Sequence, residues 1–302
     1  MFREVSLDGG RLYASLQDVG EFSRMMERPP HPSNAWMANE LNPERLIGQR
    51  EYKHKYTPAW WGGFKHSREA GELLSKGWAA GYQRIRKLQS ELAADLPSPT
   101  SRRRRSCWAE DGDSLDPDRA MAGQWDTAYR VAKRQWAPGS TSVDIAFVWG
   151  GDYQANAEEL FWTGAATLAA AEVLEEAGYN VRLVAISAIA SGVVFGAMSY
   201  HGVVIKDAEE PMRPDALAAI ACHAGIFRTL GLRAHLLAAH ELGPGCGKPR
   251  QNWPSGTGST YEALMRTGIL DAGAITVGAA YTKERAREAA QQILKQVAEA
   301  NE

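Results

Sequence analysis

A glycine-rich turn that ends in an acidic residue offers the clearest chemistry in the chain. The segment VDIAFVWGGDYQANAEELFW, residues 143–162, passes from an apolar run into Gly150, Gly151 and Asp152 and reaches a helix start at Asn156. In open α/β sheets, ligands bind where strands end and helices begin. The turn is therefore the first place to expect a phosphate, a metal ion or a protein partner.

The residues of this turn disfavour a nucleotide. A dinucleotide fingerprint needs G-x-G-x-x-G, whereas GGDYQAN has only adjacent glycines, and Asp152 would repel a pyrophosphate. A second stretch, GPGCGKPRQ at 243–251, departs from the phosphate-loop pattern, and Pro249 has no backbone N–H to donate. We therefore expect the turn to shape a protein-binding surface. Its candidate residues are Gly150, Gly151, Asp152, Tyr153 and Asn156.

The other reactive residues form no recognisable catalytic set. The chain has no G-x-S-x-G elbow, and Ser187 lies in an apolar stretch without a nearby acid. Cys222 and His223 would point about 100° apart on a helix, which favours a core cysteine beside a partly buried histidine. His235 and His240 lack the cysteine pair of a zinc site. We therefore predict no cofactor and no metal site.

A basic run lies in the middle of the chain. Arg102, Arg103, Arg104 and Arg105 are consecutive, Trp108 follows them, and a series of acidic residues comes next. Opposite charges this close can neutralise each other across a loop, which favours a solvated linker. The alternative is a nucleic-acid contact in which the arginines bind phosphates and the tryptophan stacks on a base.

Composition sets the limits for any function. The chain has 302 residues, 44% hydrophobic and 23% charged, and a net charge of −2, so it has no global attraction to nucleic acid or an anionic membrane. No stretch reaches the roughly 18 apolar residues of a membrane span. Three cysteines do not make a disulfide framework. These features predict a cytoplasmic globular protein without a membrane partner.

The chain divides into three regions that differ in amino-acid composition and pattern. Residues 1–95 are rich in tryptophan, and seven of the ten tryptophans precede residue 140. Within this smaller N-terminal region the spacing predicts an amphipathic helix over about 67–94. Gly77 and Gly81 within it predict the close approach of another backbone. Residues 96–140 read as a charged linker or insert, and residues 141–302 as an α/β domain.

The α/β domain follows from alternating patterns. VDIAFVW, NVRLVAISAIA, YHGVVIK and AGAITVGAA read as strands, and LRAHLLAAH as a further strand. Helices are expected from the Asn156 cap to about Ala177, from Pro214 to about Leu230 and after the Thr282 cap. The first strand–helix–strand unit should be right-handed with parallel strands. The fold class is therefore α/β, with a doubly wound, mostly parallel sheet in a Rossmann-like three-layer sandwich.

This order of elements resembles the von Willebrand factor A-like (vWA-like) domain. The phrases GYNVRLVAIS, HAGIFRTLGLRAH and GELLSKGWAAGYQRIRKL are similar to uncharacterised phage and prophage proteins with such domains. The resemblance covers residues 64–300. It implies a phage-encoded protein, located in the host cytoplasm, that binds a protein partner.

In the wider vWA family, an Asp-x-Ser-x-Ser turn after the first strand binds Mg²⁺ and captures an acidic residue of the partner. The resemblance places Trp149, Gly151 and Tyr153 at these three positions, and none of them is a carboxylate or a serine. The metal-ion-dependent adhesion site is therefore expected to be degenerate.

These observations favour a non-enzymatic protein-binding or assembly protein. On this hypothesis, bulky replacements of Gly150 and Asp152 abolish partner binding and leave thermal stability nearly unchanged. A first alternative is a nucleic-acid-associated protein that uses Arg102–Arg105. A second is an enzyme whose site forms at the strand ends, for example from Asp152, Asp207 and His201.

Overall fold

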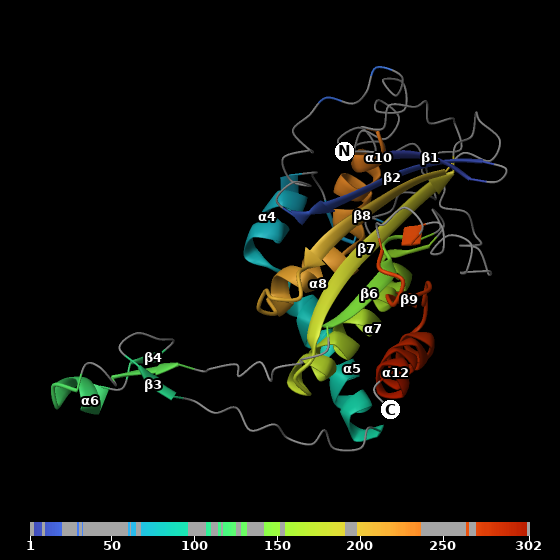
Figure 1. Ribbon diagram of the computed structural model, residues 1–302. Helices are drawn as coiled ribbons and strands as arrows, with labels where there is room; N and C mark the ends of the chain where they lie inside the picture. Colours follow the sequence, from blue (N-terminus) through green and yellow to red (C-terminus); the bar gives the residue numbers. More distant parts are fainter. Residues whose placement is uncertain are drawn as a thin grey trace.

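The main body of the protein is a six-stranded mixed sheet covered by helices. In the computed structural model the strand order is β1-β2-β8-β7-β6-β9 (Figure 1). β2 and β8, β7 and β6, and β6 and β9 pair in parallel, whereas β1 and β2 and β8 and β7 pair antiparallel. The strands span Arg3–Leu7 (β1), Gly10–Asp18 (β2), Ser142–Val148 (β6), Asn180–Ala190 (β7), Met198–Lys206 (β8) and Ile275–Val277 (β9).

The structure describes most of the chain, including every helix and strand named here. The described residues are 3–7, 10–19, 29, 32, 60, 62–64, 68–95, 107–109, 114–115, 117–124, 128–131, 142–151, 155–190, 198–236, 264–265 and 270–300.

The central strands are buried on both faces. Along β6, Ile145 and Phe147 point to the face that carries the helices, whereas Ala146 belongs to a smaller cluster on the opposite face. That smaller cluster also holds Ile186 of β7 and Leu264. Burial on both faces explains why these strands are apolar runs without polar alternation.

Helix α7, Ala157–Glu176, fills the centre of the helical layer. Asn156 caps it in a capping box with Glu159, as the sequence predicts, and Gly178 follows its end with φ +97°. The helix is buried nearly all round because it packs on β6 and β7, between α8 (Pro214–Cys222) and α12 (Lys283–Glu299), with α5 (Ala79–Asp95) on its outer side. The predicted strand–helix–strand unit is present, with β6 and β7 parallel.

The predicted helix over 67–94 is two helices, α4 (Arg68–Lys76) and α5, separated at Gly77 and Trp78. Gly77 has φ +77°, and a Cβ there would lie 2.7 Å from the Cβ of Asp215 and 3.1 Å from its backbone carbon. The backbone N–H of Trp78 donates to the carbonyl of Asp215 at 2.9 Å. The close backbone approach predicted at Gly77 is confirmed, and it is the point at which the helix breaks. At Gly81 the prediction is wrong, because a Cβ there would meet the ring of Trp78 at 2.1 Å and not another backbone.

The segment after α8 differs from the sequence prediction. α8 ends at Cys222 because His223 has an extended backbone, and its ring accepts a hydrogen bond from Gly225 N at 3.1 Å. Helix α9, a π-helix and α10 follow it. LRAHLLAAH was predicted as a strand, and this is wrong over α10, where the chain stays helical. The three elements span Ala224–Ile226 (α9), Phe227–Gly231 (π-helix) and Leu232–His235 (α10).

A second, three-stranded sheet lies within the region expected to be a charged linker. Its order is β3-β5-β4, all antiparallel, with a short helix α6 between β4 and β5 (Figure 1). The elements span Cys107–Ala109 (β3), Ser114–Leu115 (β4), Pro117–Met121 (α6) and Tyr129–Val131 (β5).

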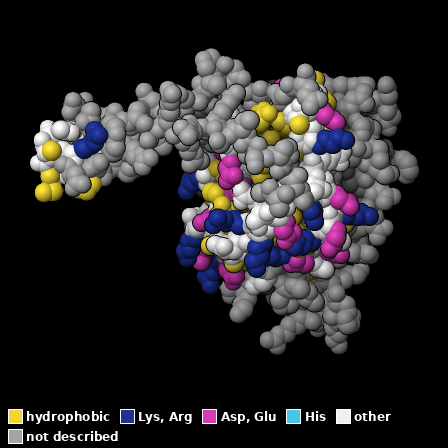
Figure 2. All heavy atoms as spheres, turned by 90° about the horizontal axis from the view of Figure 1, so that it is seen from below, with side chains coloured by type: hydrophobic (Ala, Val, Ile, Leu, Met, Phe, Trp, Pro, Cys, Tyr) yellow, Lys and Arg dark blue, Asp and Glu magenta, His cyan; other side chains and the backbone are white. Residues whose placement is uncertain are grey.

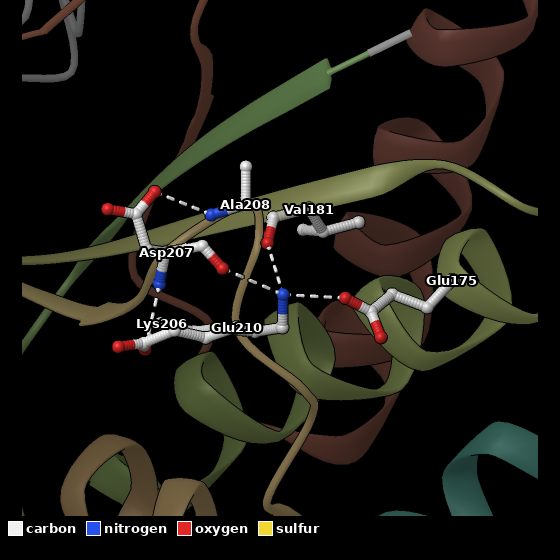
Figure 3. A network of polar contacts seen from close by, with 6 residues as sticks. All are labelled: Glu175, Val181, Lys206, Asp207, Ala208 and Glu210. Atoms are coloured by element: carbon white, nitrogen blue, oxygen red, sulfur yellow. Dashed lines mark hydrogen bonds and ion pairs between the residues drawn. The ribbon is translucent and has the colours of Figure 1, made fainter. Parts of the chain in front are cut away.

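A buried ion pair joins the end of α7 to the sheet. The Nζ of Lys206, a side chain only 1% exposed, lies 2.6 Å from Oε1 of Glu175 and donates to the carbonyls of Val181 at 2.7 Å and Asp207 at 3.0 Å (Figure 3). Because these acceptors surround the ammonium group, its charge is compensated where water is excluded.

The α/β class is therefore confirmed, with a mixed sheet. In the described part, no single helix is long and apolar enough to cross a membrane. Among the described residues, only the bent pair Pro214–Cys222 and Ala224–His235, at 61° to each other, reaches that length and composition together, and most of its residues are buried inside the protein.

Candidate functional site

The turn after β6 lies at the carboxyl ends of two parallel strands, β6 and β9. Trp149 N donates to the carbonyl of Ile186 at 2.7 Å, which continues the pairing with β7 up to the turn. Gly150 follows with φ +103°, a conformation that favours glycine. The turn thus occupies the position at which open α/β sheets bind ligands.

Side chains, mostly aromatic, pack directly against the two glycines of this turn. A Cβ at Gly150 would lie within 2.6 Å of three ring carbons of Phe227. A Cβ at Gly151 would lie 2.5 Å from Leu160 and 2.9 Å from the hydroxyl of Tyr281. The backbone therefore has no open cradle for a phosphate at these two residues. A bulky residue at Gly150 must displace Phe227, so the expectation that such a change would leave stability nearly unchanged is wrong.

A buried arginine ties the turn to the N-terminal region. Arg228, on the π-helix, donates from Nη2 to the carbonyl of Ala155 at 2.5 Å and from Nη1 to the carbonyl of Trp60. Its guanidinium also stacks 3.7 Å from the centre of the Trp60 ring. Arg228 thus holds Ala155, the residue before the α7 cap, and Trp60 of the N-terminal region with one side chain.

Polar and charged groups form the exposed rim beside the turn. Asn156 and Glu158 are exposed at the start of α7. Glu158 pairs with Arg84 of α5 at 2.5 Å, and the guanidinium of Arg84 lies 3.7 Å from the centre of the Phe161 ring. This start of α7 is therefore held firmly while its polar atoms stay accessible.

Trp149, which the vWA resemblance places at a metal-ligand position, cannot serve as one. Its side chain is 3% exposed, and its indole N–H donates to the carbonyl of Ile220 at 2.8 Å. Across the described residues, no three His, Cys, Asp or Glu side chains gather closely enough to hold a metal ion.

A serine and a histidine that lie 48 positions apart, and that no sequence motif links, meet next to the turn. Oγ of Ser187 on β7 lies 2.8 Å from Nε2 of His235 on α10. His201 is paired with Ser187 across β7 and β8, and its ring lies 6.1 Å from that of His235. Burial lowers the pKa of His201 to about 3, so this ring is neutral. If LRAHLLAAH is predicted as a helix, His235 shares a face with the apolar Leu232 three residues before it. That pattern would have placed His235 on the side of the helix that faces the sheet.

The enzyme alternative built on Asp152, Asp207 and His201 meets a geometric obstacle. Leu183 of β7 pairs with Ile145 on β6 and with Lys206 on β8, so Asp207 lies level with the early part of β6. Gly150 lies five residues beyond Ile145, which is about 16 Å along the strand. Asp207 is therefore at the opposite edge of the sheet from the turn. Asp207, Glu209 and Glu210 are exposed there.

Cys222 and His223 are both buried, as the core interpretation predicts. The ring of His223 stacks on Phe64 at 4.5 Å and meets Trp78 edge-on at 4.7 Å. Burial lowers the pKa of His223 to about 4, against a hydrogen bond to the backbone of Gly62 that raises it. Burial also raises the pKa of the Cys222 thiol well above its usual value, so this thiol is unreactive.

Comparison with known proteins gives one result. Residues 9–298 match the family described as "Domain of unknown function (DUF7192)". The chain belongs to the DUF7192 family. No curated protein and no solved structure matches this DUF7192 chain. The matched range includes β2, α4 and α5 as well as the strands and helices after residue 140.

Several predicted site residues of this DUF7192 protein lie outside the described residues. Asp152, Tyr153 and the arginines Arg102–Arg105 are among them, and so is His240. Trp108 lies on β3, where only its backbone is described. On the face drawn in Figure 2, acidic and basic side chains of the described residues are interspersed without a single-sign patch. The nucleic-acid alternative rests on Arg102–Arg105, which lie outside the described residues, and it stays a prediction.

Proposed function

We propose that this DUF7192 protein binds a protein partner in an assembly role that requires no catalysis, through a vWA-like domain with a degenerate metal site. The phage origin, the doubly wound reading of the sheet and the cytoplasmic location belong to the same proposal. The order of elements supports it: β6, α7, β7, β8 and α8 follow one another as strand, helix, strand, strand and helix. This is the order on which the vWA resemblance rests.

The observation that carries the proposal is the contrast between a fixed base and an accessible rim at the end of β6. Phe227 and Tyr281 close over the glycines, and Arg228 holds the carbonyl of Ala155. Asn156 and Glu158 stay exposed beside them. Functional contacts are commonly made by loops on a rigid support, because less conformational entropy is lost on binding.

The buried Trp149 and the closed glycines argue against the other ligands considered for this position. A metal ion needs hard oxygen ligands, and a phosphate needs open backbone N–H groups. Neither is found at Trp149, Gly150 or Gly151. A protein surface, which needs only shape and a polar rim, fits what is present.

The test is a tagged purification from the producing cell with two matched variants. D152K/Y153A changes the turn, whereas the control E209K/E210K reverses exposed charges at the opposite edge of the sheet. We expect a specific co-purified protein with the wild type and the control, and at least a tenfold loss with D152K/Y153A. Equal recovery with all three proteins would refute the proposed surface. A nuclease-sensitive 260/280 nm signal without a protein partner would favour the Arg102–Arg105 alternative.

A further inference from the structure

Ser187 and His235 have the geometry of a nucleophile and its base. The 2.8 Å separation of Oγ and Nε2 is a full hydrogen bond, and the two residues come from separate elements 48 positions apart. A serine hydroxyl is a weak nucleophile until a neighbouring base accepts its proton. A histidine ring nitrogen at hydrogen-bond distance is the group that most often does this.

The pair lies in the part of the fold where such a site belongs. Val148, the last residue of β6, pairs with Ile186, so Ser187 is level with the start of the glycine turn. Strands on both sides hold β7 in place. His235 reaches Ser187 from α10, directly after the π-helix, and π-helical turns are frequent at functional sites.

Full burial disfavours a lasting positive charge on His235, and the neighbouring histidine adds nothing to that cost. A positive charge on His201 would oppose formation of an imidazolium 6.1 Å away, but His201 is neutral in this environment. Both members of the pair are almost fully buried, Ser187 at 1% and His235 at 0% exposure. A reacting group can therefore reach them only through a local opening of the structure, which favours a small and uncharged one.

Independently of the binding role, we propose that Ser187 and His235 form a nucleophile–base pair that accepts the acyl group of a small, uncharged ester. Oγ of Ser187 bonds to the carbonyl carbon while its proton passes to Nε2 of His235. The bond from that carbon to the leaving oxygen then breaks, and the departing alcohol takes the proton from Nε2. Water attacks the acyl-serine, His235 accepts its proton and returns it to Oγ, and the carboxylic acid is released.

A small alkyl fluorophosphonate is the direct probe, because it phosphonylates activated serines and releases fluoride. We expect one covalent adduct on the intact wild-type chain, mapped by peptide mass spectrometry to Ser187. S187A should take up no label. H235Q should label at least about 100-fold more slowly, which is the usual contribution of a general base. The control S142A changes the exposed first residue of β6 and should label like the wild type.

The peptide map of the wild-type protein keeps the test decisive even if a variant folds poorly. Circular dichroism and the thermal midpoint of each variant report its folding separately. An unlabelled wild type, or an adduct on any residue other than Ser187, would overturn the proposal. So would an equal labelling rate for folded H235Q, because the serine would then react without its base.

Discussion

The phenyl ring of Phe227 covers Gly150 so closely that no side chain can be added at the glycine without moving the ring. The same ring meets Trp149 at 5.6 Å, and a Cβ at Gly231 would lie 2.7 Å from it. The turn after β6 and the π-helix therefore form one packed unit. The conformation of the turn depends on a segment that lies far away in the sequence.

Replacing Gly150 by alanine should destabilise the protein by about 2–4 kcal/mol, since the new Cβ both collides with Phe227 and holds an unfavourable positive φ. Chemical denaturation measures the change. Gly273 is the matched control, because a Cβ there meets nothing within 4 Å. A loss for Gly150→Ala no larger than that for Gly273→Ala would show that the turn is not packed as described.

Removing either partner of the Lys206–Glu175 pair should cost about 3–5 kcal/mol, because the remaining charge is buried without compensation. The double variant K206M/E175L should recover much of that loss, since it removes both charges together. Replacing Lys76, whose pair with Glu72 is exposed, should change stability by about 0.5 kcal/mol or less. Urea titrations of the wild type and the four variants measure these changes, and additive losses in the double variant would contradict the pairing.

The free energy of unfolding should fall as the pH drops below about 6.5. Burial lowers the pKa of His223 to about 4 and that of His201 to about 3, so the unfolded chain binds protons first. Each histidine then costs about 1.4 kcal/mol per pH unit, down to its folded pKa. In H223Q the free energy of unfolding should fall less steeply between pH 6.5 and 4, by the contribution of one proton, which is about 1.4 kcal/mol per pH unit. Parallel curves for H223Q and the wild type would show that His223 is not held neutral.

Glu172 should give the opposite pH dependence. Burial raises its pKa to about 7, although the Tyr82 hydroxyl bonds to it and Arg86 lies near, while Glu175 and Glu176 add to the rise. The folded state therefore holds a proton that the unfolded chain has released, and this stability is lost as the pH rises from about 4.5 through 7.

The variant E172Q keeps an acceptor for Tyr82 and removes the charge. It should melt at a higher temperature than the wild type at pH 8 and show no such advantage at pH 5, whereas E288Q, at an exposed position of α12, should change neither. Calorimetry at the two pH values measures this. An advantage of E172Q that is equal at both pH values would mean that ionisation of Glu172 is not its cause.

Local signals predicted much of the fold. The Asn156 and Thr282 caps, the apolar runs of β6 and β7 and the helical spacing of α12 are read from neighbouring residues, and each lies as predicted. The break at His223 and the pairing of β2 with β8 depend on residues distant in sequence. The cover of Gly150 by Phe227 and the meeting of Ser187 with His235 depend on the same kind of contact, so the candidate site was less predictable than its scaffold.

Site-specific photocrosslinking in the producing cell tests the central claim, that the partner contacts the carboxyl end of β6. p-Benzoylphenylalanine would replace Glu158 at the exposed rim of the turn, or Glu209 at the opposite edge of the sheet. We expect a discrete crosslinked protein adduct from position 158 and none from position 209. No adduct from position 158, or an adduct from position 209 alone, would contradict it.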